Sequence, residues 1–343
     1  MLCEGEKRNI MDSFSKKWFQ FILDHPDKPW DWYGLSENPN ISWDIIKDYS
    51  DMPWDWYQIS NNPNITWDII QNNLDKPWNW NALSEHPNIT WNIIQDNPDL
   101  LLDWLYGLSN NPNITWDIIT DNPDIQWNWN CVSRNPNITW DIIQENVDRP
   151  WNWDVLSCHP NITWDIIQDN PDKPWNWTCL SSNPSIPWNI IKDNLDKPWN
   201  WTCVSRNPNI TWNIVQNNLD KPWNWIYLSC HPNITWDIVQ NNPDKPWNMY
   251  ELSNNPNITW NIVKDNLDKP WDWSFLSHNP MTPWRNEYVF SKERTQQRCR
   301  SLQFELMAKT WHPNRFLDWC LDIDEYNEWF QDEFQSLSLV NAL

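Results

Sequence analysis

Residues 160–183 read PNITWDIIQDNPDKPWNWTCLSSN, and close copies of this 24-residue stretch fill most of the chain. The Trp of the NITW motif recurs at intervals of 24 residues, with a single interval of 25 between Trp91 and Trp116. A second pair of Trp residues, in the PWNW motif, keeps the same spacing. Self-similarity at a fixed period of about 20–50 residues is typical of solenoids and related architectures. The sequence therefore predicts a stack of similar units.

Each unit contains signals for two short helices. Thr163 is a favourable N-cap residue, so the pattern predicts a first helix over 164–169. Asn170 follows this helix and is expected to adopt the left-handed backbone conformation that ends many helices. Gly usually occupies such positions, but the chain has only 3 Gly residues. Pro174 suits the first position of a helix, which predicts a second helix from Pro174 to about Ser182.

A β-solenoid is the alternative architecture. Ile162, Trp164 and Ile166 alternate with a period of two, and Thr, Ile and Trp all favour strands. However, Pro replaces Thr at positions 187 and 283, which a helix N-terminus tolerates and a laddered strand does not. We therefore favour an all-α solenoid of about eleven 24-residue repeats with two short helices each.

Most of the 35 Trp residues occupy these repeat positions and are expected to form its core. Helices of about eight residues are not stable alone, and one buried aromatic side chain contributes about 150–250 Å² of buried area. Leu102 and Met249 are apolar replacements within the Trp positions, which suggests that these positions require buried bulk. With contacts only between neighbouring units, we expect a rod or superhelix on the order of 100 Å long. The predicted structural Trp ladder includes Trp43, Trp67, Trp91, Trp116, Trp140, Trp164, Trp188, Trp212, Trp236, Trp260, Trp175, Trp177, Trp199 and Trp201.

The repeats divide the chain into three predicted regions. Residues 1–18 are expected to form an N-terminal extension or cap, and 19–284 the repeat solenoid, which opens with a half repeat in which Phe19 replaces Trp. Residues 285–343 are expected to form a helical C-terminal cap or a docking module for a partner. Within them we predict helices over about 287–310 and 323–335.

Composition and charge exclude several classes of function. A formal net charge of −22 opposes binding to phosphate backbones, so we expect no nucleic-acid partner. No apolar run approaches the roughly eighteen residues of a membrane span, and the start lacks the apolar stretch of a secretory signal. We expect a monomeric intracellular protein, with no membrane association, whose 8 Cys are reduced.

The sequence contains no recognisable catalytic constellation, so we expect a non-enzymatic protein without cofactor or metal. His86, His159 and His231 share one repeat position, and whole repeats separate them, which predicts a structural role. The N-I-T motifs match a glycosylation acceptor but are interpreted as helix-capping segments. Cys131, Cys179 and Cys203 share another position, as do Cys158 and Cys230, and all are interpreted as small core residues.

The positions that vary between repeats are the best candidates for recognition. They follow the second Trp of each unit or precede its N-P dipeptide. The candidate recognition face includes Tyr33, Gln58, Arg134, Arg206, Tyr227 and Glu251. Rows of solvent-exposed Trp could instead stack on sugar rings, which would give a carbohydrate-binding groove. Because Trp positions accept only apolar replacements, we favour packing over exposure for them.

The succession of NPNITWDII, DNPDKPWNW and LSxNPNITW resembles the tryptophan-rich repeat proteins of mimivirus-like giant DNA viruses. The tail segment ELMAKTWHPNRFLDWCLDIDE is similar to a terminal segment common among proteins of those viruses. The resemblance implies a viral origin and a location in the host cytoplasm or the virion, and supplies no catalytic residues. We expect a scaffold for protein–protein interaction in infected cells, binding an unknown host or viral protein. The alternatives are a structural component of the virion and carbohydrate binding through exposed Trp rows.

Overall fold

The computed structural model describes residues 4–100, 102–281, 285–286, 289, 291–295, 298 and 302. In these residues the secondary structure is helical and contains no strand, so the all-α repeat prediction is confirmed and the β-solenoid alternative is not observed. The chain divides into two compact units, Met11–Asn286 and a second one formed by Met1–Ile10 with Glu287–Leu343. The repeats all lie in the unit Met11–Asn286.

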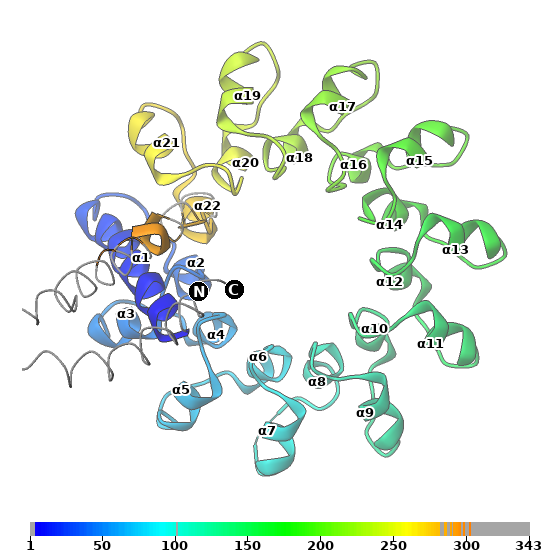
Figure 1. Cartoon of the computed structure of the whole chain (residues 1–343), viewed down its shortest axis with the longest axis horizontal. Helices are drawn as coiled ribbons and strands as arrows, with labels where there is room; N and C mark the ends of the chain where they lie inside the picture. Colours follow the sequence, from blue (N-terminus) through cyan, green and yellow to red (C-terminus); the bar gives the residue numbers. More distant parts are fainter. Residues whose placement is uncertain are drawn as a thin grey trace, which may run out of the picture. The chain divides into compact units, whose positions relative to one another are not determined.

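The helices of this unit form two concentric layers, with odd-numbered helices outside and even-numbered helices inside (Figure 1). The outer helices are α1 (Glu4–Asp24, of which the part from Met11 onward belongs to this unit), α3 (Trp43–Asp48), α5 (Trp67–Gln71), α7 (Trp91–Asp96), α9 (Trp116–Asp121), α11 (Trp140–Glu145), α13 (Trp164–Asp169), α15 (Trp188–Asp193), α17 (Trp212–Gln216), α19 (Trp236–Asn241) and α21 (Trp260–Asp265). The inner helices are α2 (Trp32–Glu37), α4 (Trp56–Asn61), α6 (Trp80–Glu85), α8 (Gly107–Asn110), α10 (Trp129–Val132), α12 (Trp153–Ser157), α14 (Trp177–Ser182), α16 (Trp201–Val204), α18 (Trp225–Ser229), α20 (Met249–Ser253) and α22 (Trp273–His278).

The outer helices begin where the sequence predicts. Helix α13 spans Trp164–Asp169, and the hydroxyl of Thr163 accepts a hydrogen bond from the backbone N–H of Ile166 at 3.5 Å. The inner helices begin later than predicted, because α14 starts at Trp177 and not at Pro174. Its N-cap is Asn176, whose side-chain oxygen accepts from two backbone N–H groups of the first turn. The polar cap, and not the preceding Pro, sets this boundary.

The predicted left-handed Asn residues are not observed. Asn170 ends α13 with φ −130°, and among described non-Gly residues only Met281 has a positive φ, of 46°. Instead, the Asn170 side-chain amide donates to the carbonyl of Ile166 at 2.9 Å. Its own carbonyl accepts from the indole N–H of Trp175 at 2.8 Å. Side-chain hydrogen bonds therefore satisfy the last carbonyls of the outer helices, which is why the turn needs no Gly.

Three Trp rings fill each regular joint between units. Trp164 and Trp177 lie in one unit with ring centroids 6.4 Å apart, and Trp199 of the next unit packs edge-on against Trp177 at 5.1 Å. The third side of the triangle, Trp164 to Trp199, is 6.1 Å. The same triangle recurs around the array, as in Trp140, Trp153 and Trp175. These clusters give the short helices the buried area that they lack individually.

A buried Ser and, in most units, a buried Asn connect each inner helix to the next. The Ser157 hydroxyl donates to the carbonyl of Trp153 and accepts from the backbone N–H of Asn176 in the following unit, at 2.7 and 2.9 Å. The Asn183 amide donates to the carbonyls of Ser157 and His159 in the preceding unit. Both side chains are almost fully buried, so these bonds hold neighbouring units in a fixed register.

The array closes into a ring, so the expected open rod or superhelix is wrong. The backbone N–H of Asp31 donates to the Ser277 hydroxyl at 3.0 Å, and the Asn38 amide donates to the Ser277 carbonyl at 2.7 Å. Trp30 packs edge-on against Trp273 at 5.1 Å, as Trp199 does against Trp177. The joint between the last and first units thus repeats the contacts of a regular joint (Figure 1).

Helix α1 completes the outer layer at this joint. The aromatic ring of Phe21 in α1 contacts Trp260 of α21. On the other side of α1, the aromatic ring of Phe19 stacks on Trp54, with 5.9 Å between the ring centroids. The half repeat predicted from Phe19 is therefore the outer half of the first unit. The segment 1–18, predicted as an extension or cap, is helical from Glu4, with Phe14 and Trp18 buried. No described helix is both long and apolar enough to cross a bilayer.

The predicted C-terminal cap or docking module, 285–343, falls almost entirely outside the described residues. This holds for the helix predicted over about 287–310, of which only isolated residues are described, and for the helix predicted near 323–335.

Candidate functional site

The surface that varies most between units is the inner face of the ring. We define the inner face as the first, second and fifth residues after the residue that begins each inner helix other than α8; that first residue is Trp, except for Met249 in α20. In α14, Leu180 and Ser181 are fully buried, and helical geometry places Thr178, Cys179 and Ser182 on the opposite side. Because the even-numbered helices form the inner layer, this side faces the ring's centre (Figure 1).

All residues of the predicted recognition face lie on these inner helices or directly after them. Tyr33 is 49% exposed, Arg134 and Arg206 are exposed, and Tyr227 and Glu251 are half-buried. Gln58 differs, since only 2% of it is exposed and its side-chain oxygen faces the amide of Asn61 at 3.5 Å. The structure therefore places five of the six at the inner surface and the sixth beneath it.

Neighbouring inner helices contact each other through a fixed pair of positions. The fifth residue after the first Trp of one inner helix contacts the second residue after the first Trp of the next inner helix. For example, the Arg206 guanidinium lies 4.1 Å from the centroid of the Tyr227 ring. At the ring's joint the same pairing joins His278 to Gly34, where a Cβ would lie 2.4 Å from the imidazole. The inner face is thus one continuous surface that crosses the joint.

An aromatic arc occupies the part of the inner face around the joint. Tyr250 packs edge-on against Phe275 at 4.5 Å, and Tyr33 lies 6.4 Å from the His278 ring. We define the aromatic arc as six residues of α18, α20, α22, α2 and α4: Ile226, Tyr227, Tyr250, Phe275, Tyr33 and Tyr57. Four of them are among the large apolar side chains that remain strongly exposed, with Tyr57 at 49% and Tyr250 at 53%.

A thiol arc occupies inner helices α10 to α18. Cys131, Cys158, Cys179, Cys203 and Cys230 are free thiols that are half-buried or, for Cys158, exposed. The prediction of small core residues is therefore wrong, because both Cys positions belong to the inner face. Partial burial raises the pKa of the Cys158 thiol to about 12, with a contribution from its hydrogen-bond contact with Cys179. Burial also raises the thiol pKa of Cys131, Cys203 and Cys230.

Acidic residues outnumber basic ones on the inner face, in about the same proportion as in the chain as a whole, which carries −22. Glu37, Glu85, Asp154 and Glu251 stand against Arg134 and Arg206.

The predicted Trp ladder lies inside the wall of the ring. Trp164, Trp199, Trp236 and Trp260 are at most 9% exposed. The remaining ladder residues are half-buried: Trp43, Trp67, Trp91, Trp116, Trp140, Trp188, Trp212, Trp175, Trp177 and Trp201. Among described Trp residues, Trp104 is the one strongly exposed, at 39%, and it stands beside the extra residue of the irregular unit. The ladder presents no row of open indole faces.

The three predicted structural His residues replace the buried Asn of the inter-unit joint. In His159, Nε2 lies 3.1 Å from the carbonyl of Asn135, and Nδ1 accepts from the backbone N–H of Asn161 at 3.2 Å. His86 and His231 make the equivalent contacts. Burial lowers the pKa of all three imidazoles. In the described part of the chain no three His, Cys, Asp or Glu side chains are grouped so as to hold a metal ion.

Comparison of the chain with protein-family models, with curated proteins and with solved structures gives no match.

Proposed function

We propose that this protein is a non-enzymatic scaffold that binds a protein partner through the inner face of its ring. The observation that carries the proposal is the division between constant and variable positions within the eleven units. The buried Ser recurs in or directly after every inner helix, while the inner-face positions hold aromatic, thiol, amide, carboxylate and guanidinium groups. A ring with a purely structural role would not need such different chemical groups at these positions.

The dimensions of the ring suit a protein segment. Eleven inner helices spaced about 8–10 Å apart enclose a circle roughly 30 Å across between helix axes. After the inner half of each helix is subtracted, an opening of about 20 Å is left, which exceeds the 10–12 Å diameter of an α-helix. A helical or extended segment of a partner would therefore contact several units at once, as ligands of curved solenoids do.

The aromatic arc is the best candidate for the centre of the contact. Tyr side chains are over-represented among residues that dominate binding energies, because they offer a large rigid surface with a hydroxyl at one end. Tyr33, Tyr57 and Tyr250 are each about half exposed, so their rings are available to a partner. The resemblance to giant-virus repeat proteins supports placing this interaction in infected cells.

Affinity capture from the lysate of infected cells tests the proposal. The bait is the full chain, compared with a variant of the aromatic arc that carries Tyr33→Ser, Tyr57→Ser and Tyr250→Ser. The matched control replaces exposed apolar residues in the turns after outer helices, with Leu74→Ser, Leu195→Ser and Leu219→Ser. We expect partners of the full chain to fall at least tenfold with the arc variant and to be retained by the control.

Equal capture by the arc variant would overturn the proposal, as would selective loss with the control. Circular dichroism and size-exclusion chromatography of each bait establish that the substitutions leave the ring folded. We do not extend the proposal to sugar binding at the Trp ladder, because those indoles are buried or half-buried in the wall.

A further inference from the structure

The unit formed by α9 and α10 differs from the other units at positions that converge on one place. Thr120 stands where the other NITW-type outer helices carry Lys or Gln. Those residues are Lys47, Gln71, Gln95, Gln144, Gln168, Lys192, Gln216, Gln240 and Lys264. Ile125 and Gln126 stand where most units have Lys-Pro, and Arg149 of the next unit stands where most have Lys.

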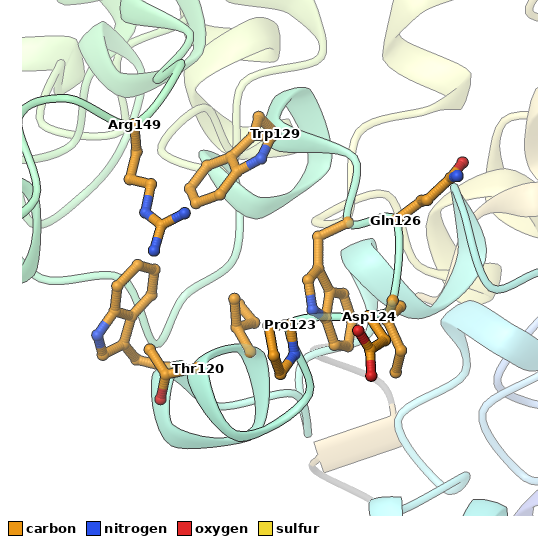
Figure 2. A pocket seen from close by; sticks show the side chains of 10 residues that line it. Thr120, Pro123, Asp124, Gln126, Trp129 and Arg149 are labelled. Atoms are coloured by element: carbon orange, nitrogen blue, oxygen red, sulfur yellow. The ribbon is translucent and has the colours of Figure 1, made fainter.

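These residues line a pocket of about 340 Å³ (Figure 2). Its apolar lining includes three indoles, Trp116, Trp127 and Trp129. Thr is shorter than Gln or Lys, so the space that those longer side chains can occupy in other units stays open here. A volume of this size lies within the range of small-molecule sites, which are mostly apolar with a few polar groups.

The pocket has a cation without a carboxylate partner. Arg149 is exposed, its guanidinium lies 5.6 Å from the Trp129 ring centroid, and among the described residues it forms no ion pair. In contrast, several Lys residues at the same position pair with the preceding Asp, as Lys221 does with Asp220 at 3.0 Å. A guanidinium held over an aromatic ring presents its N–H groups as a fork that fits a carboxylate.

We propose that this pocket binds a small aromatic monocarboxylate. The exposed parts of the half-buried Trp116 and Trp129 indoles contact the ligand's ring, and Arg149 pairs with its carboxylate. Asp124 lies on the opposite side of the pocket from Arg149 (Figure 2), where it would repel a second carboxylate. The site is independent of the inner face and of the partner proposed for it.

Isothermal titration calorimetry on the full chain tests the proposal with indole-3-carboxylate and 4-hydroxybenzoate, and with indole-3-carboxamide as the neutral control. The variant Thr120→Gln restores the residue of the other units, so it is compatible with the fold and fills the pocket. We expect it to weaken binding of both acids at least tenfold. Gln144→Thr, the matched change in the next unit, is expected to leave their affinity unchanged.

Arg149→Lys separates the carboxylate contact from the ring contact. Lys keeps the charge but loses the fork, so the acids should bind about tenfold more weakly, while the amide should be unaffected. The proposal is overturned if neither acid binds with a dissociation constant of about 1 mM or tighter, or if Thr120→Gln binds them as the unaltered chain does. An equal effect of Arg149→Lys on acid and amide would remove the carboxylate contact and with it the proposal.

Discussion

At the scale of single residues, the buried Asn between units satisfies backbone groups in both directions. Asn183 donates from its amide to two carbonyls of the preceding unit and accepts at Oδ1 from the N–H of Ser185 at 2.8 Å. His159 can replace such an Asn only as the neutral tautomer with hydrogen on Nε2, because Nδ1 must accept. A proton on Nδ1 would face a backbone N–H and break the joint.

This requirement makes the stability of the ring depend on pH. Burial lowers the folded-state pKa of His86, His159 and His231, so below the unfolded-state pKa of about 6.5 the unfolded chain binds more protons. The contribution of these three residues to the free energy of unfolding is therefore fully present above about pH 6.5. It decreases as the pH falls toward their folded-state pKa. We expect the melting temperature to fall between pH 7.5 and pH 5.

Replacement of all three His by Asn should remove the part of this pH dependence that they cause. Asn occupies the same position in other units, so the triple variant is expected to fold. Thermal unfolding of both proteins at several pH values provides the comparison. Parallel curves for the two proteins would show that carboxylate titration alone causes the pH dependence.

Cys158 should react slowly although it is exposed. A thiol pKa of about 12 leaves about a thousandfold less thiolate near neutral pH than the ordinary value of 9.0. A thiolate of higher pKa is also a stronger nucleophile, which compensates for a factor of about 20 in the lower thiolate concentration. We therefore expect alkylation of Cys158 to be about 50-fold slower than that of a free thiol. Peptide mapping after brief treatment with iodoacetamide at pH 8, with glutathione as reference, measures the rate. A rate equal to that of glutathione would contradict the prediction, and Cys179→Ser should increase the rate.

At the scale of the helix, capping defines each element. Asp or Asn precedes nearly every inner helix, and its side-chain oxygen accepts from the first turn, as Asn200 does from the N–H of Cys203 at 3.1 Å. Helix α16 has only 4 residues, so its first turn is most of its length. This one capping hydrogen bond therefore contributes a large part of the local stability of α16.

Asn200→Ala should destabilise α16 by about 1 kcal/mol, because the N–H groups of the first turn lose their acceptor. Native-state hydrogen exchange at the Cys203 amide should then be about fivefold faster. Asn200→Asp provides the control, since Asp55 and Asp272 cap α4 and α22 in the same way. Equal exchange in the Ala and Asp variants would exclude a capping role.

The sequence predicts the outer helices well and the inner ones less well, for a local reason. Thr163 is the only strong N-cap candidate before α13, so the predicted and observed starts agree. Before α14, Pro174 predicts a start that is three residues too early, because the hydrogen bonds to the Asn176 side chain set the observed start. The Trp ladder and the variable positions follow from comparison of the repeats, whereas the contact between Cys158 and Cys179 depends on how the units are stacked.

At the scale of the whole repeat unit, closure results from small angles that add. Eleven helix pairs share 360°, so each joint turns by about 33°. No single 24-residue stretch indicates this angle, which is why the sequence predicted an open rod.

A cross-link across the joint tests closure in solution. Gly34 and His278 occupy the positions that Cys158 and Cys179 occupy in a regular joint, and they lie in direct contact. The double variant Gly34→Cys, His278→Cys should form an intramolecular disulfide under mild oxidation and migrate faster on a non-reducing gel. Gly34→Cys with Arg206→Cys, on the far side of the ring, should not. An open array would give no cross-link, or only cross-linked dimers.

Closure also gives a meaning to the number of copies in the gene. Recombination between near-identical segments adds or deletes whole copies, and in an open rod such a change only alters its length. In a ring, ten or twelve copies would require about 36° or 30° at each joint, a change of roughly 3° from the present angle. Gain or loss of a copy would then widen or narrow the bore by about 3 Å, so that copy number sets the size of the segment that fits inside it.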